Sequence, residues 1–355
     1  MTTTPELIGS GLLAVSTPPT GTTVIGHADG QPIKMDLDRL IKSRLLVQAM
    51  SGAGKSYMLR LLAERFVPQV QTIIIDAEGE FFTLRDKLDM LMIGEGGEMM
   101  PTVDYASRLG NWLLQLGTSA IIDLSSMDRD DRRWFVRFFC GALLNAPKVL
   151  WHPMLLLLDE AHDMCPERGM GKAESTQAVI DLAEKGRKRG FCTVLATQRL
   201  SKLHKNAAAE CTTVLIGRTS PVDLRRAADL LGMPQRDRRG LAYMADGEWV
   251  GIGPAIGALH AIRFQGCVAE TDHLQPGRPP TRTDTDHPRV AWAAKALTQI
   301  EKPGNEWVPD RLLKDRPGVH RLVTDAEPAP IVPRGTPPTS TTNWASQRDW
   351  FKIKT

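Results

Sequence analysis

The chain contains several short runs that are almost wholly apolar, and these runs are the feature that most constrains its fold. Residues 72–76, 119–124 and 154–159 contain the sequences IIID, AIIDL and LLLLD. Such runs are typical of strands that are buried on both faces of a parallel sheet. Similar runs lie at residues 45–48, 193–196 and 213–217, and helix-like stretches alternate with them at 56–66, 129–144, 174–189 and 222–231. The alternation predicts a doubly wound α/β core with a mostly parallel sheet.

Composition changes along the chain and suggests three regions. Residues 1–24 are rich in Thr, Pro and Gly and are predicted to form an N-terminal arm, whereas residues 25–270 carry the α/β pattern. Residues 271–355 contain half of the 24 prolines. We expect this last region to be a mostly extended or disordered tail with one helical piece at 290–300, able to dock on a neighbouring subunit or a partner. The glycine-rich segment 251–257, GIGPAIG, is predicted to be a loop.

The overall composition excludes several classes of protein. No apolar run approaches the roughly 18–20 residues that span a bilayer, and the N-terminus lacks the pattern of a secretory signal. Five scattered cysteines without a CxxC pair argue against a disulfide framework or a zinc knuckle. A net charge of +3 is too small to indicate nucleic acid by itself. We therefore expect a cytoplasmic protein with no membrane partner.

A phosphate-binding loop is indicated by the sequence AMSGAGKS, which follows an apolar run and precedes a helix-like stretch. In the pattern G-x-x-x-x-G-K-[ST], backbone N–H groups approach the phosphates, the Lys reaches the β- and γ-phosphates, and the hydroxyl holds Mg²⁺. Ala49 replaces the first glycine, which is compatible with an ordinary backbone at that position. The predicted cofactors are ATP and Mg²⁺. The predicted nucleotide-binding residues are Ala49, Ser51, Gly52, Ala53, Gly54, Lys55, Ser56 and Tyr57.

Polar residues at the ends of two later apolar runs complete a predicted catalytic site. Asp159 and Glu160 follow the run MLLLL, at the strand end where ligands collect in open α/β sheets. Ser56 and Asp159 are expected to hold Mg²⁺, with Asp159 contacting a water ligand of the ion rather than the ion itself. Glu160 is expected to polarise the attacking water. Gln198 leaves the run TVLATQR and is expected to contact the γ-phosphate or that water.

With AMSGAGKS, LLLLDEAH and LATQR in this order, the chain resembles the HerA/FtsK superfamily of DNA-translocating ATPases, and more closely its HerA-like branch. Residues 25–269 carry the resemblance, which includes the stretches IIIDAEGEFFTL and AIIDLSSM. It implies a RecA-like core, a ring of six subunits, and ATP hydrolysis between subunits. HerA-like enzymes usually carry a small β-barrel before the phosphate loop; with roughly 45 residues before the loop in this sequence, we expect that barrel to be lacking.

The resemblance also implies an arginine that acts on the neighbouring subunit's nucleotide. In the FtsK branch this arginine lies nine residues before the alanine of ATQR, which corresponds to Arg187 here. Arg189 is a close alternative, and Arg218 is a further candidate for a phosphate contact. A helix C-terminus would also favour basic residues at 187–189 through its dipole.

The remaining candidates carry weaker signals. Glu80 is a possible participant in water activation or Mg²⁺ binding. Arg168 and Lys172, in the glycine-containing segment after the acid pair, are the residues predicted to contact DNA through its phosphates. Other arginine clusters occur in the sequences DRDDRRWFVRFF and PQRDRRG.

The sequence therefore favours a ring-forming ATPase that moves along duplex DNA as a translocase or helicase. Two alternatives stay open. One is an ATPase that packages or transfers DNA for a virus or mobile element. The other is a nucleotide-switched assembly module that controls a partner nuclease without processive translocation.

Overall fold

The computed structural model describes residues 21–167, 173–273, 287–300 and 306–308. The chain divides into a unit from Met1 to Arg316 and a second from Pro317 to Thr355, and all the described residues belong to the first. Residues 1–20 of the predicted N-terminal arm and most of the proline-rich tail lie outside the described residues, as do Arg168 and Lys172. The last residues of the predicted arm belong to the sheet, because its first strand begins at Thr22.

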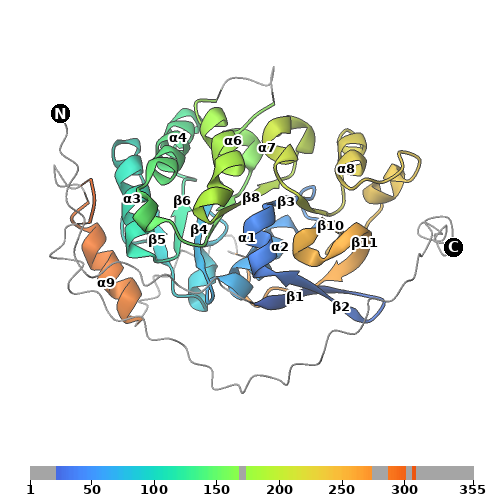
Figure 1. Cartoon of the computed structure of the whole chain (residues 1–355), viewed down its shortest axis with the longest axis horizontal. Coiled ribbons are helices and arrows are strands. Elements are labelled where there is room, and N and C mark those ends of the chain that lie inside the picture. The colour runs from blue at the N-terminus through green and yellow to red at the C-terminus, as the bar shows by residue number, and fades with distance from the viewer. Residues whose placement is uncertain (1–20, 168–172, 274–286, 301–305, 309–355) are drawn as a thin grey trace. The chain divides into compact units, whose positions relative to one another are not determined.

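An 11-stranded sheet forms the centre of the fold (Figure 1). Seven consecutive strands of this sheet are parallel to one another. In sheet order, these strands are β9 (Thr213–Ile216), β3 (Leu45–Gln48), β8 (Phe191–Thr197), β7 (Met154–Leu158), β4 (Gln71–Asp76), β6 (Ala120–Asp123) and β5 (Leu91–Ile93). All six apolar runs singled out in the sequence are strands of this parallel part. The seventh strand, β5, was missed because three residues carry too short a pattern.

Four antiparallel strands extend the sheet beyond β9. In sheet order they are β10 (Glu248–Gly253), β11 (Ala258–Gly266), β1 (Thr22–Ala28) and β2 (Gln31–Asp36). The prediction of a loop at 251–257 was wrong in part, because Gly251–Gly253 pairs with β9 and β11 at the end of β10. Only the 3₁₀ turn η7 (Pro254–Ile256) and Gly257 leave the sheet there. Glycine fits this strand because a Cβ at Gly251 would lie 2.8 Å from the side chain of Ile256.

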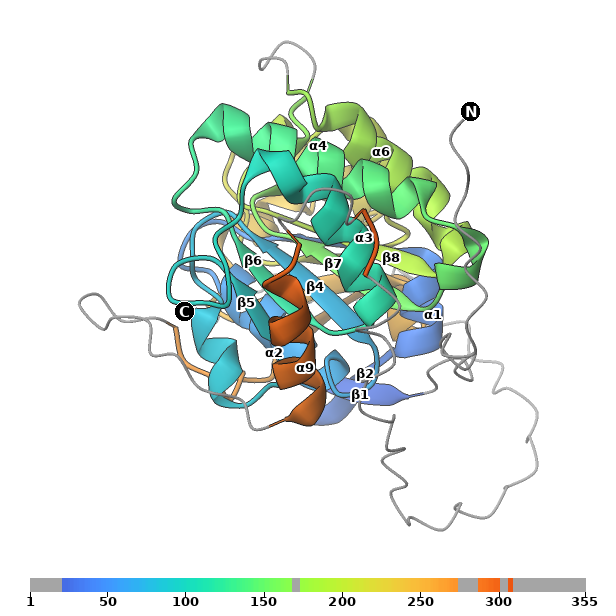
Figure 2. The same cartoon turned by 90° about the vertical axis from the view of Figure 1, so that its left-hand side faces the viewer.

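Helices cover both faces of the sheet, as Figures 1 and 2 show. The main helices are α1 (Leu37–Ser43), α2 (Lys55–Phe66), α3 (Ala106–Leu116), α4 (Arg129–Asn145), α6 (Thr176–Lys185) and α9 (Pro288–Leu297). The other helices are α5 (Ala161–Met164), α7 (Lys205–Ala209) and α8 (Leu224–Leu230). The expected helix at 174–189 ends earlier, because Gly186 begins the 3₁₀ turn η4 (Gly186–Arg189).

Alternate residues of the buried strands belong to two hydrophobic clusters, one on each face. Ile73 and Ile75 of β4 pack with α3, α4 and α6, whereas Ile74 packs with α1 and α2. Apolar side chains on both faces explain why the strand sequences read as continuous apolar runs. The predicted fold class is confirmed, with a large, mostly parallel sheet covered on both sides. Among the described residues, no helix is both long and apolar enough to cross a membrane.

Candidate nucleotide site

The loop between β3 and α2 has the backbone that the phosphate-loop motif requires. Gly52 and Gly54 adopt positive φ angles of 74° and 103°, which glycine allows at no steric cost. Ala49 is buried and is not among the described residues with positive φ, so its replacement of glycine brings no backbone strain. The loop then leads into α2 at Lys55, whose helix begins with free backbone N–H groups of the kind that bind phosphate.

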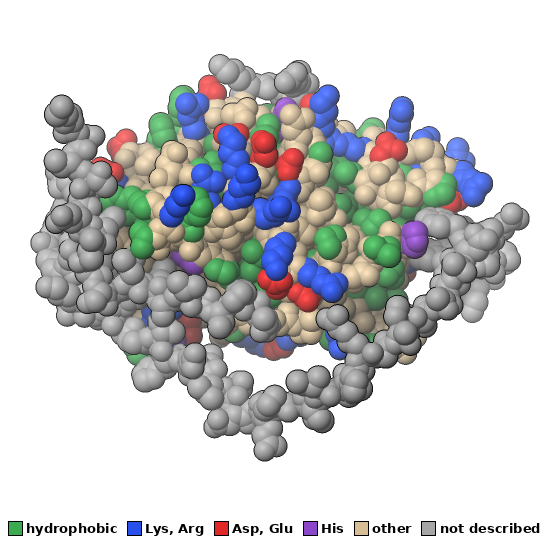
Figure 3. Space-filling model, in the orientation of Figure 1, with side chains coloured by type: hydrophobic (Ala, Val, Ile, Leu, Met, Phe, Trp, Pro, Cys, Tyr) green, Lys and Arg blue, Asp and Glu red, His purple; other side chains and the backbone are tan. Residues whose placement is uncertain are grey.

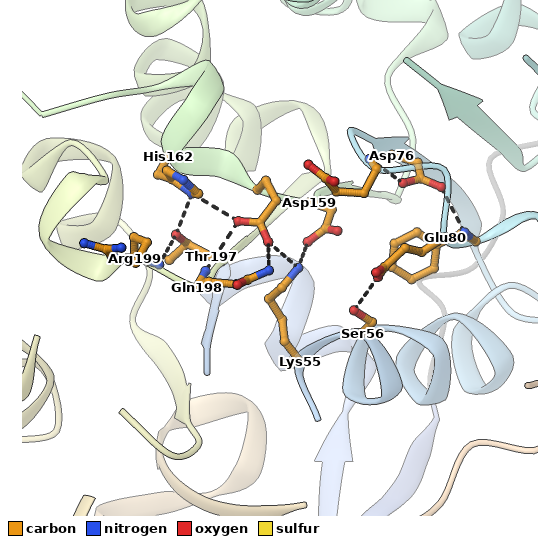
Figure 4. Close-up of polar contacts among 12 residues, drawn as sticks. Lys55, Ser56, Asp76, Glu80, Asp159, His162, Thr197, Gln198 and Arg199 are labelled. Atoms are coloured by element: carbon orange, nitrogen blue, oxygen red, sulfur yellow. Dashed lines mark hydrogen bonds and ion pairs between the residues drawn. The ribbon is translucent and has the colours of Figure 1, made fainter. Parts of the chain in front are cut away.

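Lys55 reaches across the end of the sheet to the acid pair (Figure 4). Its Nζ donates to Asp159 Oδ1 and lies 3.0 Å from Glu160 Oε1. All three side chains are buried, with exposed fractions of 5%, 0% and 4%. Burial would lower the pKa of Lys55, but the two carboxylates outweigh burial and raise it. The ammonium is therefore held charged in the position where a phosphate loop places its lysine.

Gln198 leaves β8, the strand that lies between the phosphate-loop strand β3 and the acid-pair strand β7. Its Nε2 donates to Glu160 Oε1 over 2.7 Å (Figure 4). His162 Nδ1 lies 3.1 Å from Glu160 Oε2 and 3.1 Å from Thr197 Oγ1. Burial would raise the pKa of Glu160, but the hydrogen bonds from His162 and Lys55 outweigh it and lower the pKa to about 2. Glu160 is therefore an ionised acceptor at neutral pH.

The backbone of Glu160 is also unusual. Its φ of 45° and ψ of 44° place it in the left-handed region, which costs roughly 1–3 kcal/mol for a residue with a side chain. Strain of this kind is concentrated at functional sites. Here the Glu160 carboxylate lies 3.0 Å from Lys55 Nζ and accepts a hydrogen bond from Gln198.

The site has ligands that suit Mg²⁺. Asp159 Oδ2 is buried and has no hydrogen-bond partner in the described part of the chain. Burial raises the pKa of Asp159, and the Lys55 ammonium opposes that shift. A bare carboxylate oxygen in the interior is costly unless it is paired, and Mg²⁺ binds such oxygens together with hydroxyls and phosphates. Ser56 Oγ and Asp159 therefore fit the ion.

Glu80 lies beside the phosphate loop, as the weaker sequence signal suggested. Its Oε2 accepts a 2.6 Å hydrogen bond from Ser56 Oγ (Figure 4). Its backbone carbonyl accepts from the fully buried Arg60, one turn further along α2. The sequence analysis missed Arg60. Most residues of α2 are buried, and nothing in the sequence separates a buried arginine on this helix from an exposed one.

Asp76, at the end of β4, holds the loop that carries Glu80. It accepts hydrogen bonds from the backbone N–H groups of Glu78, Gly79 and Phe81, over 2.8–3.1 Å. Complete burial raises the pKa of Asp76 to about 7, and the nearby Asp123 and Asp159 add to that shift. Its position after an apolar run, like that of Asp159, was a signal that the sequence analysis did not use.

The arginine candidates lie in two different places. Arg187 is exposed on η4, next to the start of β8, so the seven residues of that strand separate it from Gln198 by about 20 Å. Arg189 packs over the Trp151 ring at 5.0 Å and donates to the carbonyl of Lys185. Arg218 is close to the phosphate loop, where its carbonyl accepts from Met50 N and its guanidinium pairs with Asp246 at 2.7 Å.

Tyr57, predicted to bind nucleotide, is 41% exposed at the start of α2. Its ring makes an edge contact with His273, with the ring centroids 4.4 Å apart. The structure thus brings Lys55, Ser56, Glu80, Asp159, Glu160 and Gln198 together, and it separates Arg187 and Arg189 from them.

Comparisons with known proteins agree with this arrangement. Residues 21–108 match the family model described as the central domain of helicase HerA. No curated protein matches the chain.

Among solved structures, VirB4 of Thermoanaerobacter pseudethanolicus is 14% identical, with a TM-score of 0.53 over 72% of this chain and 98% of that one. The genome packaging NTPase B204 from Sulfolobus turreted icosahedral virus 2, in complex with AMPPCP, is 13% identical, with a TM-score of 0.45 over 64% and 99%. The pCW3 conjugation coupling protein TcpA, with ATPgS, is 17% identical, with a TM-score of 0.44 over 71% and 67%.

The likeness to VirB4 concerns the fold, and the family match concerns the segment that contains the phosphate loop and Glu80. The predicted resemblance is confirmed: the chain is similar to HerA over residues 21–108 and has the fold of the FtsK/HerA-like class of P-loop ATPases.

Proposed function

We propose that this protein hydrolyses ATP in a ring of identical subunits and uses the hydrolysis to move along duplex DNA. One observation carries the proposal: Lys55, the acid pair and Gln198 converge from three neighbouring strands into one buried cluster. The match to the central domain of helicase HerA supports the choice of a DNA motor over other uses of this fold.

Each residue of the cluster has a proposed task. Lys55 binds the β- and γ-phosphates, and the first turn of α2 supplies backbone N–H groups. Mg²⁺, held by Ser56 and Asp159, would neutralise charge on the phosphate oxygens. Glu160 orients and activates the attacking water, and Gln198 contacts both Glu160 and the γ-phosphate position, so it responds to the loss of that phosphate.

Arg187 is proposed to complete the site of the neighbouring subunit. It lies at the opposite end of β8 from Gln198, too far to reach the nucleotide of its own chain, and it is exposed. An arginine supplied by a neighbour stabilises the charge that develops during phosphoryl transfer. Arg189 suits this role less well because its guanidinium is already packed on Trp151.

The test is steady-state ATP turnover, measured with and without long duplex DNA over a range of protein concentrations. Glu160→Gln is the inactive control. A steep rise of specific activity with concentration, together with stimulation by DNA, is the expected result. Turnover that ignores both DNA and concentration would overturn the motor and favour a nucleotide-switched module instead.

A further inference from the structure

We propose that one surface at the α8 end of the sheet, which we call the arginine face, grips the phosphate backbone of DNA. It consists of Arg225 on α8 and of Arg236, Arg238, Arg239 and Tyr243 in and around the 3₁₀ turn η6 (Arg238–Ala242). The inference rests on the proposed DNA motor and assigns a surface to its partner. Figure 3 shows Lys and Arg side chains gathered over the α8 end of the molecule.

Hydrogen bonds join the two segments into one surface. Gln235 Nε2 donates to the carbonyl of Arg225 over 3.3 Å and to Asp229 Oδ1 over 2.6 Å. Gln235 Oε1 in turn accepts from Arg238 Nη1 over 2.8 Å. Residues that are ten or more positions apart in the chain are therefore held side by side, which a solvated and independent loop would not require.

The charge of the arginine face is mostly unpaired. Four guanidinium groups lie near two carboxylates, of which Asp229 accepts from Gln235 and Asp237 lies 3.9 Å from Arg236 Nε. The Arg236 side chain is 84% exposed. Within the described residues, no acidic partner is recorded for Arg225 or Arg239. Guanidinium groups that are free in this way match phosphate oxygens, which they bind in pairs.

Tyr243 adds a second kind of contact. It is 80% exposed, which leaves both its ring and its hydroxyl accessible to a partner. It lies directly after η6, so its hydroxyl and ring are presented together with the arginines. Tyrosine hydroxyls commonly donate to DNA phosphates, and the ring can pack on a sugar.

Hydrogen bonds connect the arginine face to two segments of the nucleotide site. Thr219 N donates to Leu241 O of η6 over 2.9 Å, and Thr219 Oγ1 donates to Gln48 Oε1 at the end of the phosphate-loop strand. On the other side, Arg226 of α8 donates to the carbonyls of Leu200 and Leu203, just after Gln198. A shift of the Gln198 segment therefore moves the element that presents the arginines.

The experiment measures binding of a fluorescently labelled, random-sequence duplex by anisotropy, as a function of salt. The Arg236→Ala/Arg239→Ala double variant is compared with an Arg39→Ala/Lys42→Ala control. The control also removes two exposed charges, which lie on α1 and pair with Asp36 and Asp38. Thermal melting verifies that both variants fold.

We expect the double variant to bind roughly tenfold more weakly, and the slope of log affinity against log salt to fall by about one for each guanidinium removed. The control should match the unaltered protein, and Arg236→Lys/Arg239→Lys should recover most of the affinity. Tyr243→Phe against Tyr243→Ala separates the hydroxyl from the ring.

Two results would overturn the proposal, and they differ in what else they overturn. If the unaltered protein binds duplex and the double variant binds with equal affinity and salt slope, the arginine face is wrong and the motor stands. If the unaltered protein does not bind duplex at any salt concentration, the proposed DNA motor fails together with the arginine face.

Discussion

The two ends of the parallel strands differ in how their charged side chains are placed. At the carboxyl end, Lys55, Asp159 and Glu160 are buried and bonded to one another. At the amino end, Arg187 and Lys188 are exposed on η4, and no acidic partner is recorded for them within the described residues. Figure 3 shows basic side chains in a band over α6 and α1, on that side of the molecule.

The difference indicates whether the charged side chains at each end interact within their own chain or with another molecule. Buried ion pairs contribute little net stability, because desolvation offsets most of the attraction, so the carboxyl-end cluster is better explained by chemistry than by folding. Exposed cations cost nothing in water and become effective only when a partner arrives. One end of the sheet thus holds the proposed nucleotide site, and the other holds the arginine that is proposed to complete the same site of a neighbouring subunit.

The largest effect is expected from removing Arg187 at the amino end of the strands. Arg187→Ala should lower ATP turnover by roughly 10³–10⁵-fold, because the charge that develops on the transferred phosphoryl group loses its counter-charge. Since Arg187 is exposed, the melting temperature should stay unchanged. Lys188→Ala, one residue away and also exposed, is the matched control and should retain turnover. Equal losses in both variants would show that general basicity, and not Arg187, matters.

The next effect concerns the carboxyl end. Glu160→Gln keeps the shape of the side chain but removes the carboxylate, so turnover should fall by about 10²–10⁴-fold. Nucleotide binding, measured by the fluorescence of a labelled ATP analogue, should persist because Lys55 and the backbone of the loop remain. Loss of binding in step with turnover would mean that Glu160 shapes the pocket and does not activate water.

The pH dependence of stability tests the buried carboxyl group of Asp76. Its pKa rises from 3.8 to about 7 on folding, so the folded protein binds this proton more tightly than the unfolded chain. The contribution of Asp76 to stability is therefore fully present below about pH 4 and is lost as pH rises to about 7, at up to about 1.4 kcal/mol per pH unit. Denaturant unfolding of Asp76→Asn should show a flatter profile over this range. The same slope in the variant would exclude Asp76 as its source.

The smallest effect separates the two neighbouring arginines. Arg189→Ala removes the packing on Trp151 and should cost about 0.5–1 kcal/mol of stability. Turnover should change little, since Arg189 is already engaged within its own chain. Chemical denaturation gives the first quantity and steady-state assays the second. A loss of turnover as large as that of Arg187→Ala would transfer the proposed role to Arg189.

Much of the fold was predictable because short apolar runs in the sequence mark the buried strands. The apolar runs at β3, β4, β6, β7, β8 and β9 are buried on both faces, and the residues of the phosphate loop and acid pair follow directly at their ends. The hairpin of β1 and β2 was missed although Asp29 and Gly30 have positive φ, as an Asp-Gly turn requires. Strand β10 was missed because its glycines, Gly251 and Gly253, resemble a loop.

The contacts around Glu80 could not be predicted in the same way. Arg60 donates to the carbonyl of Glu80 and, over 3.3 Å, to Thr271 Oγ1, which lies 211 positions further along the chain. Glu64 on the same helix accepts from Thr271 N over 2.7 Å. Contacts between such distant segments follow from the packing of the whole sheet and leave no periodic trace in the sequence.

The most direct test of the account is to mix two inactive variants. Each active site is proposed to combine Glu160 of one subunit with Arg187 of the next. Mixed rings of Glu160→Gln and Arg187→Ala subunits would therefore contain some interfaces with both residues intact. The account predicts that ATP turnover returns on mixing, with a maximum near equal amounts of the two variants. Mixtures that stay as inactive as the separate variants would contradict a site shared between subunits.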